Sequence, residues 1–376
     1  MPAAKENKST ICLNMIVKNE AHVIRRCLES AKPYVDSWVI SDTGSTDGTQ
    51  DLVREIMADI PGELIERPWQ NFGHNRNEAL EAASGKADYV LIIDADEELV
   101  CAERFDFSNL TENAYYIYKE QPGQKYAILN IVKNDMGWYW EGVIHEALTN
   151  EHDDSRGEIT YENAKIIARQ EGARSLDPNT YRKDAALLTS ALKKDPQNTR
   201  YQYYLAQSWR DAEEYGLAIK HYRKRIKMGG WHEEVFCAQY QIAMAMESRG
   251  DDWQKIQQAY LEAYSHTPVR CEPLYRIGLH YNEQQDWHMA WLFLSRAAQL
   301  DVPDGHILFI ENPVYEYLAA IEAGVAAYYL GYHLEAIELN EKALASPEIP
   351  DHLRDLVRRN SDLCNDELKK LTSSAA

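Results

Sequence analysis

The chain has 376 residues, which at about 150 residues per domain suggests two or three domains. Hydrophobic residues make up 45% and charged residues 27%, the balance of a folded protein with ample material for a core. Sixty acidic residues against 40 basic ones give a net charge of −20, which argues against nucleic acid as the main partner.

No apolar stretch reaches the roughly 20 residues that span a bilayer, and the polar N-terminus lacks the apolar core of a signal peptide. The six cysteines are scattered without a metal-binding or disulfide-framework spacing, which is typical of free thiols in a reducing compartment. We therefore expect a soluble cytoplasmic protein without a membrane span.

Short apolar runs alternate with amphipathic segments through the first half of the chain. The predicted elements are a strand at Ile11–Val17, a helix at Ala21–Ala31, a strand at Ser37–Ser41, a helix from Thr49 to about Ala58, a strand at Glu63–Glu66, a helix at Asn75–Ala83 and a strand at Tyr89–Ile93. This alternation indicates βαβ units on a largely parallel sheet. Such sheets bind ligands beyond the carboxyl ends of their strands.

From about Leu176 onward the pattern changes to helix–turn–helix, so we place the boundary between domains 1–175 and 176–376. Small residues recur where two helices must approach closely, at Ala206, Ala243, Gly278 and Gly324. The steps between them are 37, 35 and 46 residues, close to the 34 of a tetratricopeptide repeat except for an insertion in the last step. We expect an all-α repeat domain; an irregular helical bundle is the alternative.

Two carboxylates follow the last predicted strand of the first domain. In an extended chain Asp94 and Asp96 lie on the same face, where their mutual repulsion favours a cation between them. A solvated acidic turn is the alternative interpretation.

Three further polar segments follow or precede predicted elements. Residues 41–49 contain glycines and hydroxyls before a helix, a composition that suits phosphate or ribose oxygens as well as an ordinary helix cap. Arg76 at a helix start suggests a nearby anion, such as a diphosphate or a carboxylate. Residues 138–148 place three aromatics before His145 and Glu146, a combination that can stack on a sugar, bind a metal or move a proton.

These segments together resemble the successive motifs of family 2 glycosyltransferases with the GT-A fold. The resemblance, over about residues 10–150, rests on LNMIVKNEAHVIRRCLES, VISDTGSTDGT, FGHNRNEALEAA and YVLIIDADEEL. GVIHEAL, followed by RYQYYLAQSWRDAEEY and RCEPLYRIGLHY, resembles the subgroup in which tetratricopeptide-like repeats follow the GT-A domain. The chain lacks the ED pair and QxxRW of many processive members, which argues against a polysaccharide synthase and leaves the catalytic base unassigned by motif.

The resemblance implies an α/β GT-A domain, Rossmann-like with a mostly parallel sheet, that transfers a sugar from a nucleotide-sugar donor with inversion. A UDP-sugar is the first expected donor, and Mn²⁺ or Mg²⁺ the expected cofactor. The resemblance implies the following roles: Val17, Asn19, Glu20 and Asp42 border the nucleotide, Asp94 and Asp96 hold the metal and the sugar diphosphate, and His145 is a further metal ligand.

A carboxylate is expected to remove the proton from the acceptor hydroxyl, with Glu146 as the first candidate and Glu141 as the second. Either glutamate could instead orient His145. The expected acceptor is a protein, a peptide or a glycan held by the repeat domain.

Two other functions compete with this prediction. The chain could be a non-catalytic protein whose repeats bind a peptide while the first domain is a relic, although clustered carboxylates have no use in a relic. It could also be a nucleotidyltransferase, which the missing Gly-rich, Arg/Lys-containing loop near the N-terminus disfavours.

Overall fold

The computed structural model describes residues 8–121, 124–152 and 155–374. The chain forms two compact units, Met1–Ala191 and Leu192–Ala376, which divide within helix α5 (Thr180–Lys194). The boundary predicted after residue 175 lies one helix earlier. Arg174 in α4 (Ala173–Leu176) donates to Asp184 of α5 at 2.9 Å, so the first part of α5 is bonded to the N-terminal unit.

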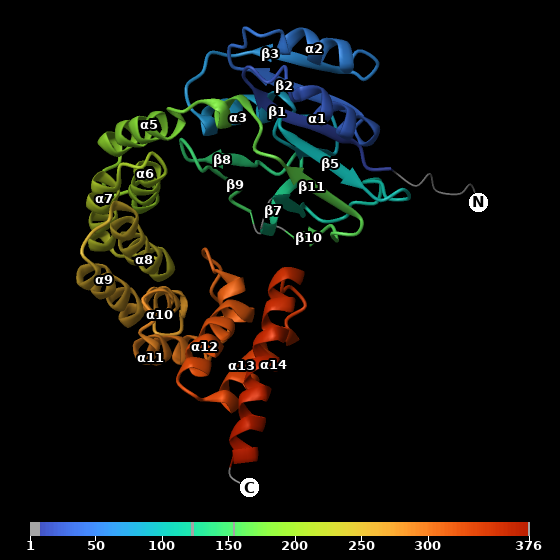
Figure 1. The fold of residues 1–376 in the computed structure, drawn as a ribbon. Helices are drawn as coiled ribbons and strands as arrows, with labels where there is room; N and C mark the ends of the chain where they lie inside the picture. The colour runs from blue at the N-terminus through green and yellow to red at the C-terminus, as the bar shows by residue number, and fades with distance from the viewer. Residues whose placement is uncertain (1–7, 122–123, 153–154, 375–376) are drawn as a thin grey trace. The chain divides into compact units, whose positions relative to one another are not determined.

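A mixed sheet forms the centre of the N-terminal unit (Figure 1). Its order is β3-β2-β1-β4-β7-β6-β11-β5, and β10 pairs with β6. The strands are β1 (Ile11–Val17), β2 (Ser37–Asp42), β3 (Gly62–Glu66), β4 (Tyr89–Ile92), β5 (Glu97–Cys101), β6 (Ala114–Gln121), β7 (Gln124–Lys133), β10 (Arg156–Glu158) and β11 (Ala164–Ala168). The first four strands pair in parallel, as predicted, whereas β7 is antiparallel to both β4 and β6.

Helices cover both faces of this sheet because its central strands are apolar on both faces. Leu13 and Met15 of β1 pack in one cluster with α1 (Ile24–Ala31), whereas Cys12 packs in another with α3 (Phe72–Ala82). Helix α2 (Thr49–Ile56) contacts α1 and β3. Alternate residues of β1 therefore face opposite sides of the sheet, as expected of a strand that is buried on both faces.

The second half of the N-terminal unit was not predicted. The described residues between 97 and 168 form seven strands, of which β8 (Tyr139–Glu141) and β9 (Ala147–Thr149) make a separate hairpin. The hairpin contacts α3 and carries the segment from Gly142 to Glu146 in its loop.

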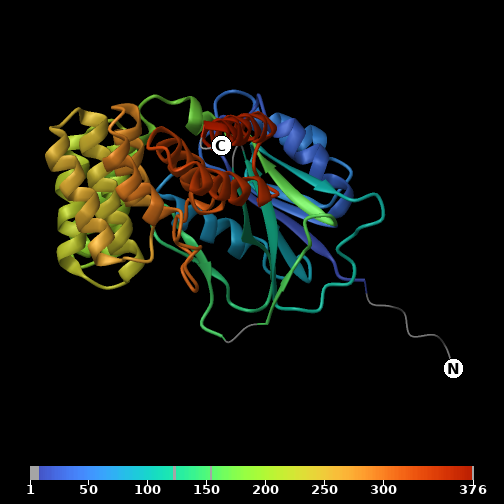
Figure 2. The same ribbon diagram turned by 60° about the horizontal axis from the view of Figure 1, so that its bottom comes forward.

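The C-terminal unit consists of helices stacked in chain order. They are α6 (Thr199–Asp211), α7 (Tyr215–Met228), α8 (His232–Arg249), α9 (Trp253–His266), α10 (Glu272–Glu283), α11 (Trp287–Ala297), the π-helix η2 (Val314–Leu318), α12 (Ala319–Tyr329), α13 (His333–Ala345) and α14 (Asp351–Ser374). Figure 2 shows the yellow and green helices of this unit side by side.

The recurring small residues lie where helices meet, which confirms the predicted helical repeat. Ala206 and Ala243 are fully buried. A Cβ on Gly278 would lie 2.3 Å from Cγ of Leu294, so α10 and α11 require glycine at this contact. The predicted insertion is an irregular segment at residues 301–311, between α11 and η2. Among the described helices, none combines the length and the apolar composition needed to span a membrane.

Candidate functional site

Three of the predicted site residues, Val17, Asp42 and Asp94, lie at or just beyond the carboxyl ends of β1, β2 and β4. Val17 and Asp42 end their parallel strands and are partners in the register, and Asp94 follows β4 by two residues. The strand order reverses between β1 and β4, the position where open α/β sheets bind ligands.

Asp42 offers an unsatisfied acceptor at this edge. Its Oδ1 accepts hydrogen bonds from the amides of Gly44 at 2.9 Å and Ser45 at 2.8 Å. Its Oδ2 is buried and, among the described residues, has no hydrogen-bond partner. A buried carboxylate oxygen without a donor costs free energy, so this atom is suited to a donor from a ligand.

The loops that follow β1 and β2 are bonded to each other. Asn19 adopts the left-handed conformation, with φ of 59°, and its side-chain oxygen accepts the amide of Thr46 at 2.8 Å. The amide of Glu20 donates to Oγ1 of Thr49 at 2.9 Å. Asparagine tolerates this conformation better than most residues, which explains why it stands at the turn.

A close contact between α3 and the β8–β9 hairpin brings Arg76 to Glu146. A Cβ on Gly73 would lie 2.0 Å from the carbonyl oxygen of Gly142, so only glycine fits there. Asn77 of the same helix bonds both backbone groups of Trp140, with distances of 2.7 and 2.9 Å. The hairpin loop is therefore held against the first two turns of α3.

Arg76 connects two of the predicted carboxylates. Its Nε lies 2.7 Å from Oε1 of Glu146, and its Nη2 lies 2.6 Å from Oδ1 of Asp94. Partial desolvation acts to raise the pKa of Asp94, but the positive charges of Arg76 and Lys119 outweigh this effect and hold that pKa below its usual value. The position of Arg76 at a helix start predicted a nearby anion, and the carboxylates of Asp94 and Glu146 provide it.

A second ion pair, which the sequence analysis missed, lies beside the first. Nζ of Lys119 on β6 lies 2.6 Å from Oε1 of Glu97, and Oε2 of Glu97 accepts the amide of Asp94 at 3.0 Å. Burial acts to lower the pKa of Lys119, but Glu97 and Asp94 raise it above its ordinary value, so this lysine is charged. Alternate residues of β6 are buried, and Lys119 follows Tyr115 and Ile117 in this pattern. A lysine at a buried position of a strand is unusual, and this signal could have predicted the ion pair.

A cavity of about 300 Å³ contains the ion pairs. Its lining includes Arg76, Asp94, His145 and Glu146 of the predicted residues, together with Trp140 as the one contributor from the aromatic triplet. Glu141, at the exposed end of β8, is absent from the described residues that line it.

The carboxylates of Asp96 and Glu20 accept hydrogen bonds from a different segment of the chain, at residues 172 and 173. Oδ2 of Asp96 accepts the amide of Gly172 at 3.1 Å, and the carboxylate of Glu20 accepts the amide of Ala173 at 3.2 Å. Burial is the main reason that the pKa of Glu20 rises to about 7; the Ala173 amide opposes the rise and the charge of Asp96 adds to it.

The two aspartates do not lie on one extended face, because the chain turns after β4. The amide of Glu97 donates to the carbonyl of Asp94 at 3.0 Å, which closes a turn over residues 94–97. In the described part of the chain, Asp94, Asp96 and His145 do not bring three ligand atoms, one from each residue, within 4.8 Å of one another. The role of these three residues as a metal site therefore stays a proposal.

Comparisons with known proteins agree with this architecture. Residues 12–100 match the family model of glycosyl transferase family 2. Over 91 residues the chain is 42% identical to a TPR repeat-containing protein of Synechococcus elongatus, covering 24% of this chain and 21% of the relative. Over 93 residues it is 33% identical to glycosyltransferase SunS of Bacillus phage SPbeta, and this match also covers 24% of this chain and 21% of the relative. The matches thus span about a fifth of the length of these relatives.

Two solved structures match the chain at low sequence identity. A crystal structure of residues 1–349 of S. aureus TarS in complex with UDP-GlcNAc is 14% identical, with a TM-score of 0.38, and the match covers 69% of this chain and 92% of TarS 1–349. The crystal structure of MamA is 20% identical, with a TM-score of 0.34, and covers 44% of this chain and 88% of MamA. From the family match and the helical repeat described above, the chain carries a glycosyl transferase family 2 domain followed by TPR-like repeats.

Proposed function

We propose that this protein is a metal-dependent, inverting glycosyltransferase that moves a sugar from a nucleotide sugar, with a UDP-sugar as the first candidate, to the hydroxyl of a protein, peptide or glycan acceptor. The observation that carries the proposal is the Arg76–Asp94–Glu146 cluster in its cavity, within a family 2 domain.

Asp42 is the proposed contact for the nucleobase. Its buried Oδ2 requires a donor, and a base that presents an N–H group, as uracil does, supplies one. Val17, Asn19 and Glu20 surround the same strand ends and complete the proposed nucleotide side of the site.

Arg76 is the proposed contact for the diphosphate. In the reaction, a bond forms between the acceptor oxygen and the anomeric carbon while the bond from that carbon to the diphosphate breaks. Negative charge develops on the leaving diphosphate, and a preorganised guanidinium in a partly enclosed site stabilises that charge. Glu146 takes the proton that leaves the acceptor hydroxyl, and Glu141 is the second candidate for this role.

The donor set of Asp94, Asp96 and His145 fits Mn²⁺ or Mg²⁺ in its chemistry. Both cations accept carboxylate oxygens, and Mn²⁺ also accepts imidazole. Asp94 is 40% exposed, and the bond from Arg76 occupies its Oδ1 alone. A bound cation would supply further positive charge to the diphosphate.

Release of free nucleotide from a panel of sugar nucleotides, with Mn²⁺ and with excess chelator, tests the proposal. One donor should give metal-dependent release, and Asp96→Ala should abolish it together with metal-dependent nucleotide binding while the circular dichroism spectrum stays unchanged. Asp355→Ala, a change at a side chain that is 70% exposed on α14, should retain full release. Release that persists in chelator would overturn the metal dependence, and binding without any release would favour the non-catalytic alternative.

A further inference from the structure

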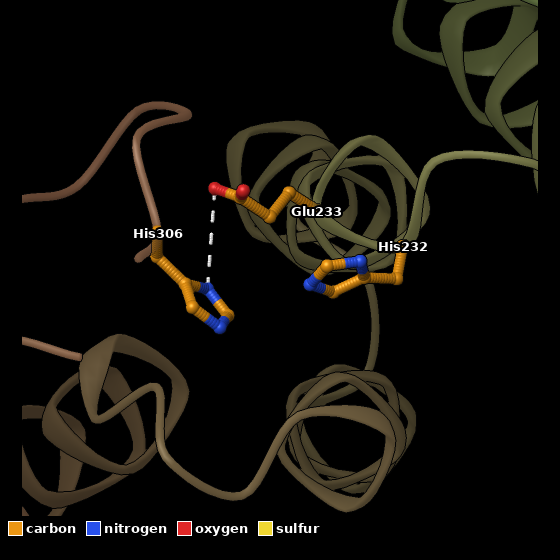
Figure 3. A group of neighbouring side chains, drawn as sticks. All are labelled: His232, Glu233 and His306. Carbon is orange, nitrogen blue, oxygen red and sulfur yellow. Dashed lines mark ion pairs between the residues drawn. The ribbon is translucent and has the colours of Figure 1, made fainter. Parts of the chain in front are cut away.

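Three potential metal ligands meet in the C-terminal unit, outside the proposed catalytic cavity. His232 and Glu233 are the first two residues of α8, and His306 belongs to the irregular segment 301–311. One ligand atom from each lies within 4.8 Å of the other two. Figure 3 shows the three side chains pointing toward one another from these two segments.

The carboxylate of Glu233 is buried and held in place by the segment that carries His306. Its Oε2 accepts the amides of Ile307 and Leu308, each at 2.8 Å. Hydrogen bonds that orient a carboxylate in this way are typical of metal ligands.

His306 brings a nitrogen whose hydrogen-bonding capacity is unused. Its Nδ1 lies 3.9 Å from Oε2 of Glu233, beyond hydrogen-bond distance, and is buried with no hydrogen-bond partner among the described residues. The ring of His232 stands edge-on to that of His306, with 5.4 Å between the centroids. A cation between the three groups would satisfy the buried nitrogen and the carboxylate together.

We propose that His232, Glu233 and His306 bind one Zn²⁺ ion. Two imidazoles and one carboxylate form a ligand set that zinc prefers, whereas Mg²⁺ and Ca²⁺ favour oxygen ligands. Tetrahedral coordination leaves a fourth position for water or for a side chain of a binding partner, and the exposure of His232 gives the ion access. The bound ion would tie segment 301–311 to the start of α8. This site is independent of the proposed transferase activity.

Zinc content and cobalt spectroscopy on the full chain test the site. The protein is stripped with EDTA, desalted and titrated with Zn²⁺, and the Asp96→Ala background removes zinc bound at the proposed catalytic site. One zinc per chain should remain bound and should raise the melting temperature. Co²⁺ in its place should give the visible absorption of a tetrahedral site.

Three histidine variants locate the ion. His232→Gln and His306→Gln should each weaken zinc binding by more than about 100-fold, because loss of a direct ligand should exceed the loss caused by an outer-shell partner. His288→Gln, an exposed residue of α11, is the matched control and should bind zinc normally. Because His232 is exposed, its replacement should fold even where His306→Gln does not.

The absence of bound zinc and of a tetrahedral cobalt spectrum would overturn the proposal, as would unchanged zinc binding in His232→Gln. The cluster would be only an imidazolium–carboxylate pair under two conditions. The unmodified chain would take up no zinc, and His306→Gln would lower the melting temperature by an amount that depends on pH.

Discussion

Arg76 donates its Nε hydrogen to Oε1 of Glu146 across 2.7 Å, although the two residues are 70 positions apart. This bond links the helix that follows β3 to the loop of the β8–β9 hairpin. Within the proposed reaction, an entering diphosphate competes with Glu146 for the same guanidinium. We therefore expect the proton-accepting oxygen of Glu146 to become available as the donor binds.

The Arg76 cluster should contribute to stability. The side chains of Arg76 and Glu146 are 12% and 9% exposed, so Arg76→Gln leaves a buried carboxylate without its cation. We expect a loss of about 3–5 kcal/mol in the free energy of unfolding, measured by urea denaturation. Arg54→Gln, at a side chain that is 53% exposed, should cost less than about 1 kcal/mol.

A double-mutant cycle checks the cause of that loss. Adding Glu146→Gln to Arg76→Gln removes the stranded carboxylate and should restore part of the lost stability. Additive losses from the two changes would show that the pair is not coupled.

Glu20 should make stability depend on pH. Its pKa is about 7 in the folded chain against an ordinary value of 4.5, so the unfolded chain releases this proton at lower pH than the folded one. The free energy of unfolding should therefore fall as the pH rises from about 4.5 to about 7. Melting temperatures in EDTA across this range should fall less steeply for Glu20→Gln than for the unmodified chain.

Glu103→Gln, at an exposed glutamate, is the matched control and should follow the unmodified chain at every pH. Parallel curves for Glu20→Gln and the unmodified chain would contradict the assignment.

Local sequence predicted the first four strands of the sheet because each is apolar and lies between helical patterns. It also predicted that Asp42 and Asp94 would lie at one edge, since parallel strands end on the same side. Both predictions depend only on residues that are close together in the sequence.

The remainder of the site depends on partners far apart in sequence. Asp96 meets the amide of Gly172, 76 positions away, and Lys119 of β6 pairs with Glu97 of β5. Strand pairing of this kind is decided by tertiary packing rather than by intrinsic preference, so the sequence left β5–β11 unassigned. The turn after Asp94 likewise depends on the bond from its amide to Glu97.

The repeat unit is proposed to present the acceptor. Repeats of this type offer extended surfaces for a chain-like partner. A chain ending after Lys194, which keeps α5 whole, should bind the sugar nucleotide and hydrolyse it slowly but transfer poorly to the natural acceptor. Calorimetric donor binding and transfer assays on both forms measure this, and equal transfer by the two forms would rule out the role of the repeats.

The identity of the catalytic base can be decided by one conservative change. Glu146→Gln keeps the size of the side chain and can still accept the bond from Arg76 through its amide oxygen. If Glu146 is the base, nucleotide affinity should stay near normal while the transfer rate falls by roughly 10²–10⁴ at every metal concentration. If Glu146 instead orients His145, metal affinity should fall and extra Mn²⁺ should restore much of the rate.

Titrating Mn²⁺ against the transfer rate of Glu146→Gln separates these two roles, because only the second is rescued by metal. Glu141→Gln is the natural comparison, since Glu141 lies on the same hairpin but outside the cavity and should leave the rate unchanged. A near-normal rate in Glu146→Gln together with a large loss in Glu141→Gln would transfer the role of base to Glu141. That result would require the hairpin loop to rearrange when the donor binds, because a proton acceptor must come within about 3 Å of the attacking hydroxyl.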